Sequence, residues 1–288
     1  MHIGRDKMRR PMLRRCIGGS VLLAFVLGWW YFLPAPLFRV PYSTVILDRE
    51  GEIMGMTVAG DGQFRVSGRG RLSGKYVAAL LCFEDKRFFT HEGVDPLAVA
   101  RALWLNVRSG SVVSGGSTLT MQVVRLSREN PPRTIPEKIL EMFLALRLEQ
   151  SYNKWEILNM YADHAPFGGN IVGIQTAALK YFNRQPDELS WAEAALLAVL
   201  PNAPALMYPG KNMPELKAKR DKLLRELHET GYFGEDDLTV AIAEPLPEQV
   251  YSPECITPHL LAKAYGQRRG QISSTFIDSR LQARGKMI

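Results

Sequence analysis

The sequence predicts a mainly α-helical body that follows an N-terminal transmembrane segment and a small β-hairpin. Two observations indicate the helices. A polar cap residue with glutamate three positions later recurs along the chain, and the run at 139–148 is apolar on nearly every side. A third observation is an uncharged stretch that follows a cluster of basic residues, and it indicates the membrane segment. The helical body covers about 74–233, and the tail beyond it shows weaker patterns.

The membrane segment is predicted at residues 16–33, an uncharged stretch of 18 residues. This length is near the lower limit for crossing a hydrocarbon core of about 30 Å. Basic residues precede it at Arg5, Lys7, Arg9, Arg10, Arg14 and Arg15. The distribution of positive charge therefore predicts a cytoplasmic tail at 1–15 and an exported remainder. The alternative is a cleaved signal peptide, although its apolar region is normally shorter.

After this segment, residues 43–54 predict a small hairpin with its turn at 49–51. A helix is expected to start at Asp95, because aspartate is a good N-cap and the next residue is proline. Three further helix starts fit the capping-box pattern, at Thr134 with Glu137, Asn153 with Glu156, and Ser190 with Glu193. The last of these helices should end at Pro201, and another should run from Pro214 to Gly231.

The formal net charge of +7 favours an anionic partner, which is a nucleic acid, a phospholipid surface or a phosphorylated substrate. The three cysteines, Cys16, Cys82 and Cys255, are widely spaced and fit neither a zinc site nor a disulfide framework. The histidines likewise show no metal-ligand spacing.

Glu141 is the first candidate for chemistry, because it interrupts the apolar run at 139–148. An ionised carboxylate in such a place is costly unless it is paired. Lys138 precedes it by three residues and lies on the same helical face, so it is the expected partner. The alternative is a structural ion pair at an exposed helix edge.

Glu84 and Asp85 form the second candidate. Phe83, Phe88 and Phe89 surround them in the sequence and supply an apolar setting that raises a carboxyl pKa towards the range useful for proton transfer. The alternative is a helix C-terminus with ordinary surface charges.

The third candidate is a glycine-rich loop at 115–116 that leads into a polar helix start. Its side chains can hold sugar hydroxyls or phosphate oxygens, and they are Ser117, Thr118, Gln122 and Arg125. The spacing does not match a phosphate-binding P-loop.

Together these blocks resemble the family 51 glycosyltransferases, which are the glycan-polymerising domains of class A penicillin-binding proteins and of monofunctional transglycosylases. The resemblance rests on Glu84-Asp85-x-x-Phe88-x-x-His91-x-Gly93-x-Asp95, Gly116-Ser117-Thr118-x-Thr120-x-Gln122 and Lys138-x-x-Glu141. It continues with Ile157-Leu158-x-x-Tyr161, Phe167-Gly168 and Leu189-x-x-x-Glu193-Ala194-Ala195. The stretches at 118–122 and 165–169 most resemble the penicillin-binding protein 1C branch.

The resemblance implies a lysozyme-like helical domain at 43–233 with a small membrane-associated subdomain. It implies polymerisation of lipid II, with Glu84 as the general base that deprotonates the acceptor hydroxyl and Glu141 as its supporting carboxylate. Arg125, Arg133 and Lys138 are expected to neutralise the pyrophosphate. Asp85, Ser117, Thr118 and Gln122 are expected to contact the substrate. A divalent cation, Mg²⁺ or Mn²⁺, is compatible with the pyrophosphate, and the sequence indicates no site for it.

Three departures from the family pattern occur, at Met121, Glu137 and Asp163. They concern rate and donor affinity, since none removes a proposed catalytic group. Ser151 and Lys154 fit the Ser-x-x-Lys pattern of penicillin-reactive enzymes, but no Lys-Thr-Gly follows, so Ser151 is interpreted as a helix cap. Residues 234–288 resemble the segment that leads into a transpeptidase domain, and the chain is expected to lack that domain.

The sequence therefore predicts a single-pass protein of the bacterial inner membrane with a periplasmic catalytic domain. Its expected partners are lipid II, the growing glycan chain, the membrane and other wall-synthesis proteins, and no nucleic acid. Two alternatives stay open. One is a non-catalytic scaffold of the wall-synthesis machinery, and the other is a lysozyme-type hydrolase that uses two carboxylates.

Overall fold

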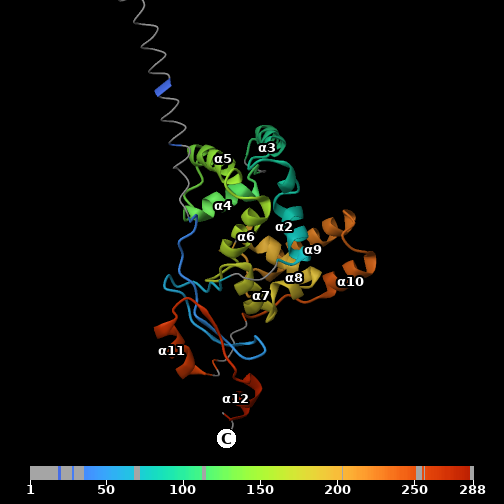
Figure 1. Ribbon diagram of the computed structural model, residues 1–288. Helices are drawn as coiled ribbons and strands as arrows, with labels where there is room; N and C mark the ends of the chain where they lie inside the picture. The colour runs from blue at the N-terminus through green and yellow to red at the C-terminus, as the bar shows by residue number, and fades with distance from the viewer. Residues whose placement is uncertain are drawn as a thin grey trace, which may run out of the picture.

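The computed structural model describes residues 19–20, 28, 36–67, 72–111, 115–202, 204–250, 255 and 257–285. The predicted basic tail at 1–15 and almost all of the predicted membrane segment at 16–33 lie outside these residues. No helix within the described ranges is both long and apolar enough to cross a bilayer. The described chain is mainly helical, as the sequence predicts (Figure 1).

One group of packed helices consists of α2 (Gly74–Glu84), α8 (Trp191–Val199), α9 (Met213–Glu229) and α10 (Glu235–Ala243) (Figure 1). Helix α8 is the centre, since every residue from Ala192 to Val199 is buried and α2, α9 and α10 all pack against it. Small alanines let the neighbouring helices approach, and the Ser190–Glu193 capping box starts the helix as predicted.

The neighbouring layer consists of α4 (Leu119–Ser127), α5 (Ile135–Glu149), α6 (Lys154–His164) and α7 (Ile174–Phe182). Helix α4 packs against both α5 and α6, and α6 packs against α7. Short 3₁₀ turns connect parts of the body at Phe88–Thr90, Pro186–Glu188 and Leu200–Asn202. The predicted capping box at Asn153 is confirmed, whereas at Thr134 only the cap side chain forms its bond, because Glu137 pairs with Arg128 instead.

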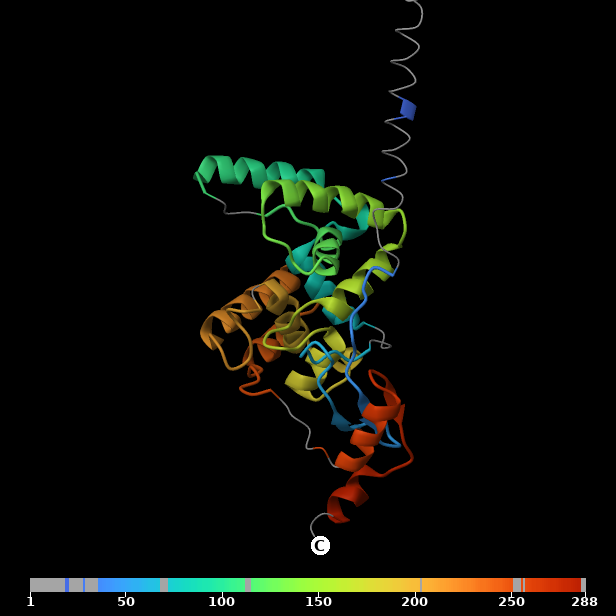
Figure 2. The same ribbon diagram turned by 90° about the vertical axis from the view of Figure 1, so that its left-hand side faces the viewer.

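Helix α3 (Pro96–Ser109) lies beside α5 at the top of the molecule, away from α9 and α10 (Figure 2). The predicted start is confirmed, since the Asp95 carboxylate accepts hydrogen bonds from the amides of Leu97 and Ala98. Only Ala102 of this helix is buried. Helix α3 therefore leaves a largely apolar face uncovered.

The predicted hairpin is confirmed as β1 (Val45–Leu47) and β2 (Ile53–Met56), which pair antiparallel. A strand that the sequence did not predict, β3 (Ile272–Ser274), adds to β1 in parallel. Helices α11 (Pro258–Gln267) and α12 (Ser279–Gly285) flank this sheet at the opposite end from α3 and α5 (Figures 1 and 2). The tail thus folds back onto the hairpin.

Candidate active site

Glu84 is the last residue of α2, and it faces a polar cavity of about 320 Å³. The chain bends here because Asp85 leaves helical geometry as the C-cap. The cavity lies between the end of α2, the start of α3 and the loop before α4. Its polar lining includes Lys86, Arg87, Arg101, Ser117 and Thr118.

The two carboxylate oxygens of Glu84 have different surroundings. Oε2 accepts a hydrogen bond of 2.7 Å from Nε2 of Gln122 on α4, whereas Oε1 is buried and has no hydrogen-bond donor among the described residues. Burial raises the pKa of Glu84, and the amides of Gln122 and Asn202 and the charge of Arg125 partly oppose this rise. A carboxylate with a raised pKa and an uncommitted oxygen is suited to accept a proton.

Asp85 is buried, and its carboxylate links the end of α2 to neighbouring elements of the site. Its carboxylate contacts Nε2 of His91 at 3.0 Å and accepts a hydrogen bond from the Leu119 amide at 3.0 Å. These bonds fix the end of α2 to the start of α4, and hence Glu84 to Gln122. Asp85 is therefore a positioning residue in this arrangement, and its predicted contact with substrate stays a prediction.

Thr118 also has a structural role at the start of α4. Its Oγ1 accepts from the Met121 amide at 3.2 Å and donates to the Gly93 carbonyl at 2.6 Å. Gly116 lies close to α3, where a side-chain carbon would come within 2.9 Å of the Cα of Val99. The glycine is needed so that the loop can reach the cavity. Ser117, between them, is half-buried and lines the cavity.

Glu141 is buried on α5, with 2% of its surface exposed. The prediction that Lys138 pairs with it is wrong. Arg125 of α4 instead donates two hydrogen bonds to it, from Nε to Oε1 and from Nη2 to Oε2, both 2.6 Å long. The two-point geometry of a guanidinium matches a carboxylate better than an ammonium does. Nη1 of Arg125 makes no hydrogen bond with the described residues.

The three cations that the sequence predicted for the site lie in different places. Arg125 binds Glu141, and its charge lowers the pKa of Glu84. Lys138 and Arg133 lie at the start of α5, where Lys138 is half-buried, Arg133 is exposed, and neither forms an ion pair with a described residue. Sequence reasoning missed Lys86, Arg87 and Arg101 as cavity residues, although the first two directly follow Asp85.

Ser151 follows α5 and is not the N-cap of α6, which is Asn153. Its Oγ accepts a hydrogen bond from Nη1 of Arg147. The Lys154 ammonium is bound to the His91 carbonyl and to Oε1 of Glu149 at 2.7 Å. Lys154 is therefore engaged elsewhere and does not activate Ser151.

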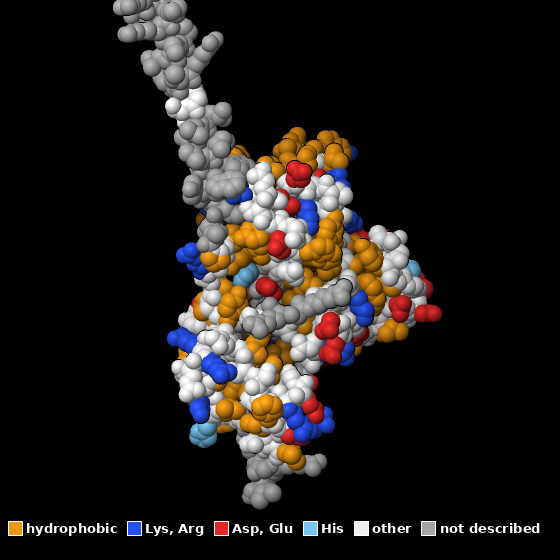
Figure 3. Space-filling model, in the orientation of Figure 1, with side chains coloured by type: hydrophobic (Ala, Val, Ile, Leu, Met, Phe, Trp, Pro, Cys, Tyr) orange, Lys and Arg blue, Asp and Glu red, His pale blue; other side chains and the backbone are white. Residues whose placement is uncertain are grey.

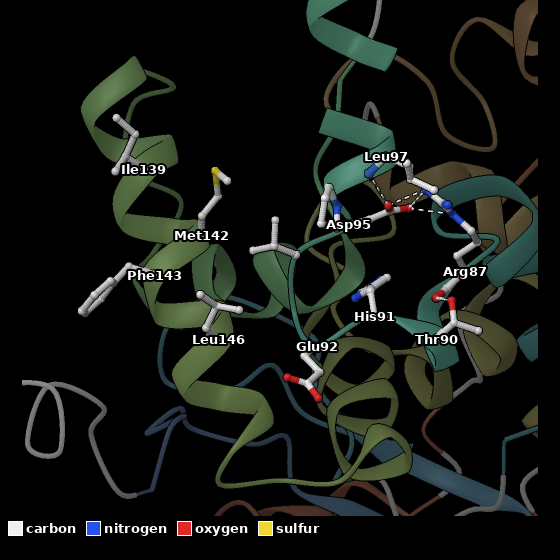
Figure 4. A pocket seen from close by; sticks show the side chains of 12 residues that line it. Arg87, Thr90, His91, Glu92, Asp95, Leu97, Ile139, Met142, Phe143 and Leu146 are labelled. Atoms are coloured by element: carbon white, nitrogen blue, oxygen red, sulfur yellow. Dashed lines mark hydrogen bonds and ion pairs between the residues drawn. The ribbon is translucent and has the colours of Figure 1, made fainter. Parts of the chain in front are cut away.

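A second cavity of about 810 Å³ adjoins the polar one and shares Arg87 and Asp95 with it. Figure 4 shows one wall formed by apolar side chains of α5, among them Ile139, Met142 and Leu146. The facing wall carries Asp95, which forms an ion pair with Arg87. A polar pocket therefore lies next to a larger apolar one. Within the described ranges, no group of three or more His, Cys, Asp or Glu side chains could hold a metal ion.

Comparison with known proteins finds similar sequences among the penicillin-binding proteins. The chain is 35% identical over 277 residues to penicillin-binding protein 1C of Escherichia coli. This alignment covers 93% of this chain and 35% of that protein. It is 34% identical to penicillin-binding protein 1A of Aquifex aeolicus, over 78% of this chain and 31% of that protein. The crystal structure of penicillin-binding protein 1A from Haemophilus influenzae aligns with a TM-score of 0.41 and 18% identity, over 87% of this chain and 29% of that chain.

The chain thus spans about a third of the length of these relatives. Residues 55–228, which include α2 to most of α9 and all the candidate site residues, match the family described as transglycosylase. The chain belongs to the transglycosylase family.

Proposed function

We propose that this protein is a peptidoglycan glycosyltransferase that polymerises lipid II into glycan strands and releases undecaprenyl pyrophosphate. The observation that most supports this proposal is the environment of Glu84. Its carboxyl pKa is raised, Gln122 donates a hydrogen bond to one oxygen, and the other oxygen has no hydrogen-bond donor among the described residues. The side chain lies at the wall of a cavity that is lined by cations. Transfer to a sugar hydroxyl needs a base in such a setting.

In the proposed reaction, Glu84 takes the proton of the acceptor 4-hydroxyl while that oxygen attacks the anomeric carbon of the donor. The bond from this carbon to the pyrophosphate oxygen breaks, and its electron pair leaves with undecaprenyl pyrophosphate. Gln122 holds the carboxylate in the orientation that leaves Oε1 towards the proton. A base of this kind typically accelerates a reaction about 10²–10⁴-fold.

The leaving pyrophosphate requires fixed positive charge. Arg101 lines the cavity and forms no ion pair with a described residue, and Nη1 of Arg125 is unused by Glu141. We assign these two groups to the phosphates, with Lys138 and Arg133 at the edge of the site. Glu141 then acts through Arg125, whose guanidinium it holds in place.

A lipid-linked substrate also suits the apolar surroundings. The exposed apolar side chains of α3 and α5 include Leu97, Leu103, Trp104, Val107, Ile135 and Ile139. Figure 3 shows apolar side chains gathered at the α3 end. We propose that α3 and α5 form the membrane-associated subdomain of a lysozyme-like domain at 43–233. In this arrangement residues 1–15 are cytoplasmic, 16–33 cross the inner membrane, and 234–288 follow the catalytic domain in the periplasm.

A lysozyme-type hydrolase is the second candidate, because it uses two carboxylates. The two-point bond between Glu141 and Arg125 weighs against it, since both oxygens of Glu141 are occupied. A non-catalytic scaffold would not require the uncommitted oxygen of Glu84.

The three candidates are separated by one assay. Purified protein in detergent is incubated with labelled lipid II, and the products are sized. We expect polymeric glycan, blocked by moenomycin, which mimics the lipid-linked donor. Cleavage of preformed glycan without polymerisation would favour the hydrolase, and neither reaction in a folded protein would favour the scaffold.

A further inference from the structure

Helix α3 exposes an apolar stripe with arginines along its border. Leu103 and Val107, which lie one turn apart, have 61% and 80% of their surfaces exposed. The neighbouring row along the helix is also exposed, and it consists of Leu97, Arg101, Trp104 and Arg108. A helix that lies in a membrane surface has this layout, with an apolar stripe towards the lipid tails, tryptophan at its edge and cations beside it.

Helix α3 (Pro96–Ser109) has two arginines and no aspartate or glutamate, so its own charge is positive. Its cap residue Asp95 forms an ion pair with Arg87. The carboxylates of the neighbouring helix α5 are all engaged, Glu137 by Arg128, Glu141 by Arg125 and Glu149 by Lys154. The exposed carboxylates of residues 92–149, Glu92 and Glu129, lie on loops outside both helices. The surface of α3 therefore favours an anionic partner.

Arg108 is the arginine of α3 that the candidate active site does not use. The polar cavity is lined by Arg101 and not by Arg108. The Cζ of Arg108 lies 5.2 Å from the centre of the Trp104 ring, and its guanidinium forms no ion pair with a described residue. The ring attracts one face of the guanidinium, while the N–H donors point outwards in the plane of the group and stay available to an anion.

We infer that Arg108 and Trp104 form a binding site for the headgroup of an anionic phospholipid. The inference rests on the proposed function, which places α3 at the membrane, and adds a preference for one class of lipid. The guanidinium donates hydrogen bonds to the phosphate oxygens, the indole lies at the interface, and Leu103 and Val107 reach the lipid tails. A zwitterionic lipid carries a cation of its own beside the phosphate, so its attraction to Arg108 is weaker.

Such a site affects the polar cavity through the position of α3. The same helix lines this cavity with Ala98 and Arg101. A lipid bound at Arg108, about two turns further along, holds the helix at the depth of the headgroups, which is where a lipid-linked substrate carries its pyrophosphate. Anionic lipid therefore keeps the cavity level with the group that it has to bind.

A purely structural role for Arg108 is the alternative. The residue lies in the last turn of α3, where a cation stabilises the helix through its dipole. Loss of this role would lower the Tm of a variant without affecting which lipids surround Trp104. The test therefore measures the lipids next to Trp104.

The full chain is reconstituted in vesicles of phosphatidylcholine with a minor share of phosphatidylglycerol. Bromine, which quenches tryptophan on contact, is placed on the tails of the phosphatidylglycerol in one set and of an equal amount of the phosphatidylcholine in the other. The signal of Trp104 is the difference between each protein and its Trp104→Phe counterpart. We expect stronger quenching by brominated phosphatidylglycerol, corresponding to a local enrichment of about fivefold at low salt, since one cation contributes about 1 kcal/mol at an anionic surface. Added salt should reduce this enrichment.

Arg108→Gln should abolish the preference, while Trp104 is still quenched by both lipids. The matched control is Arg225→Gln on α9, because Arg225 is also exposed and forms no ion pair with a described residue. This control should keep the preference of the wild type. Equal quenching by both lipids in the wild type would overturn the headgroup site. A preference that persists in Arg108→Gln would overturn the assignment to Arg108, and a lower Tm in that variant would then assign the residue to the helix end.

The lipid measurement needs no substrate, so it is independent of the polymerisation assay. Glycan synthesis with equal quenching by the two lipids would overturn this inference alone. A preference for phosphatidylglycerol in a folded protein that makes no glycan would overturn the proposed activity alone. A Trp104 signal that neither lipid quenches would overturn both the inference and the membrane placement of α3, and would leave the apolar stripe to a protein partner.

Discussion

Arg125 and Glu141 join α4 to α5 through a two-point ion pair, with both N–O distances at 2.6 Å and only 14% and 3% of their side chains exposed. A second ion pair, between Arg128 at the C-cap of α4 and Glu137 of α5, lies nearer the surface. One pair is buried beside the candidate base and the other is partly solvated. The buried pair should therefore contribute a different amount to the free energy of unfolding than the partly solvated pair does.

Arg125→Met is expected to destabilise the fold by about 3–5 kcal/mol, because it leaves the Glu141 carboxylate buried without a partner. Arg128→Met is the matched control and should cost less than about 1 kcal/mol, as exposed pairs do. Chemical denaturation measures both. The double variant Arg125→Met/Glu141→Leu should recover much of the loss, since no buried charge is left. Equal costs for the two single variants would contradict this account.

Glu84→Gln is expected to reduce polymerisation by about 10²–10⁴-fold, because the amide cannot take the acceptor proton. The fold should persist, since burial already disfavours the charge of Glu84. Glu229→Gln on the exposed end of α9 is the control for removal of one carboxylate. Activity within a few-fold of wild type in Glu84→Gln would remove Glu84 as the base.

Local patterns in the sequence predicted much of the fold and part of the site. The capped helix starts at Asp95, Asn153 and Ser190 were predictable because a cap depends on neighbours within three residues. Strand β3 was not, because its pairing with β1 joins segments more than two hundred residues apart. No periodicity within the tail indicates that contact.

The same limit applies to the ion pair of Glu141. Lys138 was its expected partner because it is three residues away on one helix. The partner is Arg125, on another helix, since guanidinium geometry and the approach of α4 to α5 decide the pairing. The sequence equally could not predict that the hydroxyls of Tyr76 and Tyr161 lack a hydrogen-bond partner among the described residues, because burial without a partner is a property of the packed structure.

Asp163→Asn should stabilise the protein near pH 7 and have no effect below about pH 4. Burial raises the pKa of Asp163 from 3.8 to about 6, so the native state binds this proton more tightly than the unfolded chain does. The stability that the protonated carboxyl contributes is complete below the unfolded pKa and is lost as the pH rises through 6. The gain in the variant at pH 7 should be about 1–2 kcal/mol, because the carboxyl keeps partial solvent contact.

This prediction is checked by denaturation of both proteins between pH 4 and pH 8. The neighbouring His164 has the opposite effect, because burial lowers its pKa to about 4 and the native state loses stability on acidification. Its contribution is common to both proteins and cancels in the difference. A difference that does not change with pH would mean that Asp163 is not desolvated in the folded protein.

Trp104 on α3 should enter the bilayer if α3 and α5 form the membrane-associated subdomain. Its surface is 59% exposed, and Val107 and Leu103 beside it are exposed to 80% and 61%. Tryptophan favours the interface between water and lipid. In proteoliposomes with bromine-labelled lipid tails, Trp104→Phe should remove a measurable part of the quenched fluorescence. Trp191→Phe is the control, since Trp191 packs against Phe233 with a centroid distance of 4.7 Å, and its loss should leave the quenched part unchanged. Equal quenching in wild type and Trp104→Phe would place α3 outside the membrane and leave its apolar face for another partner.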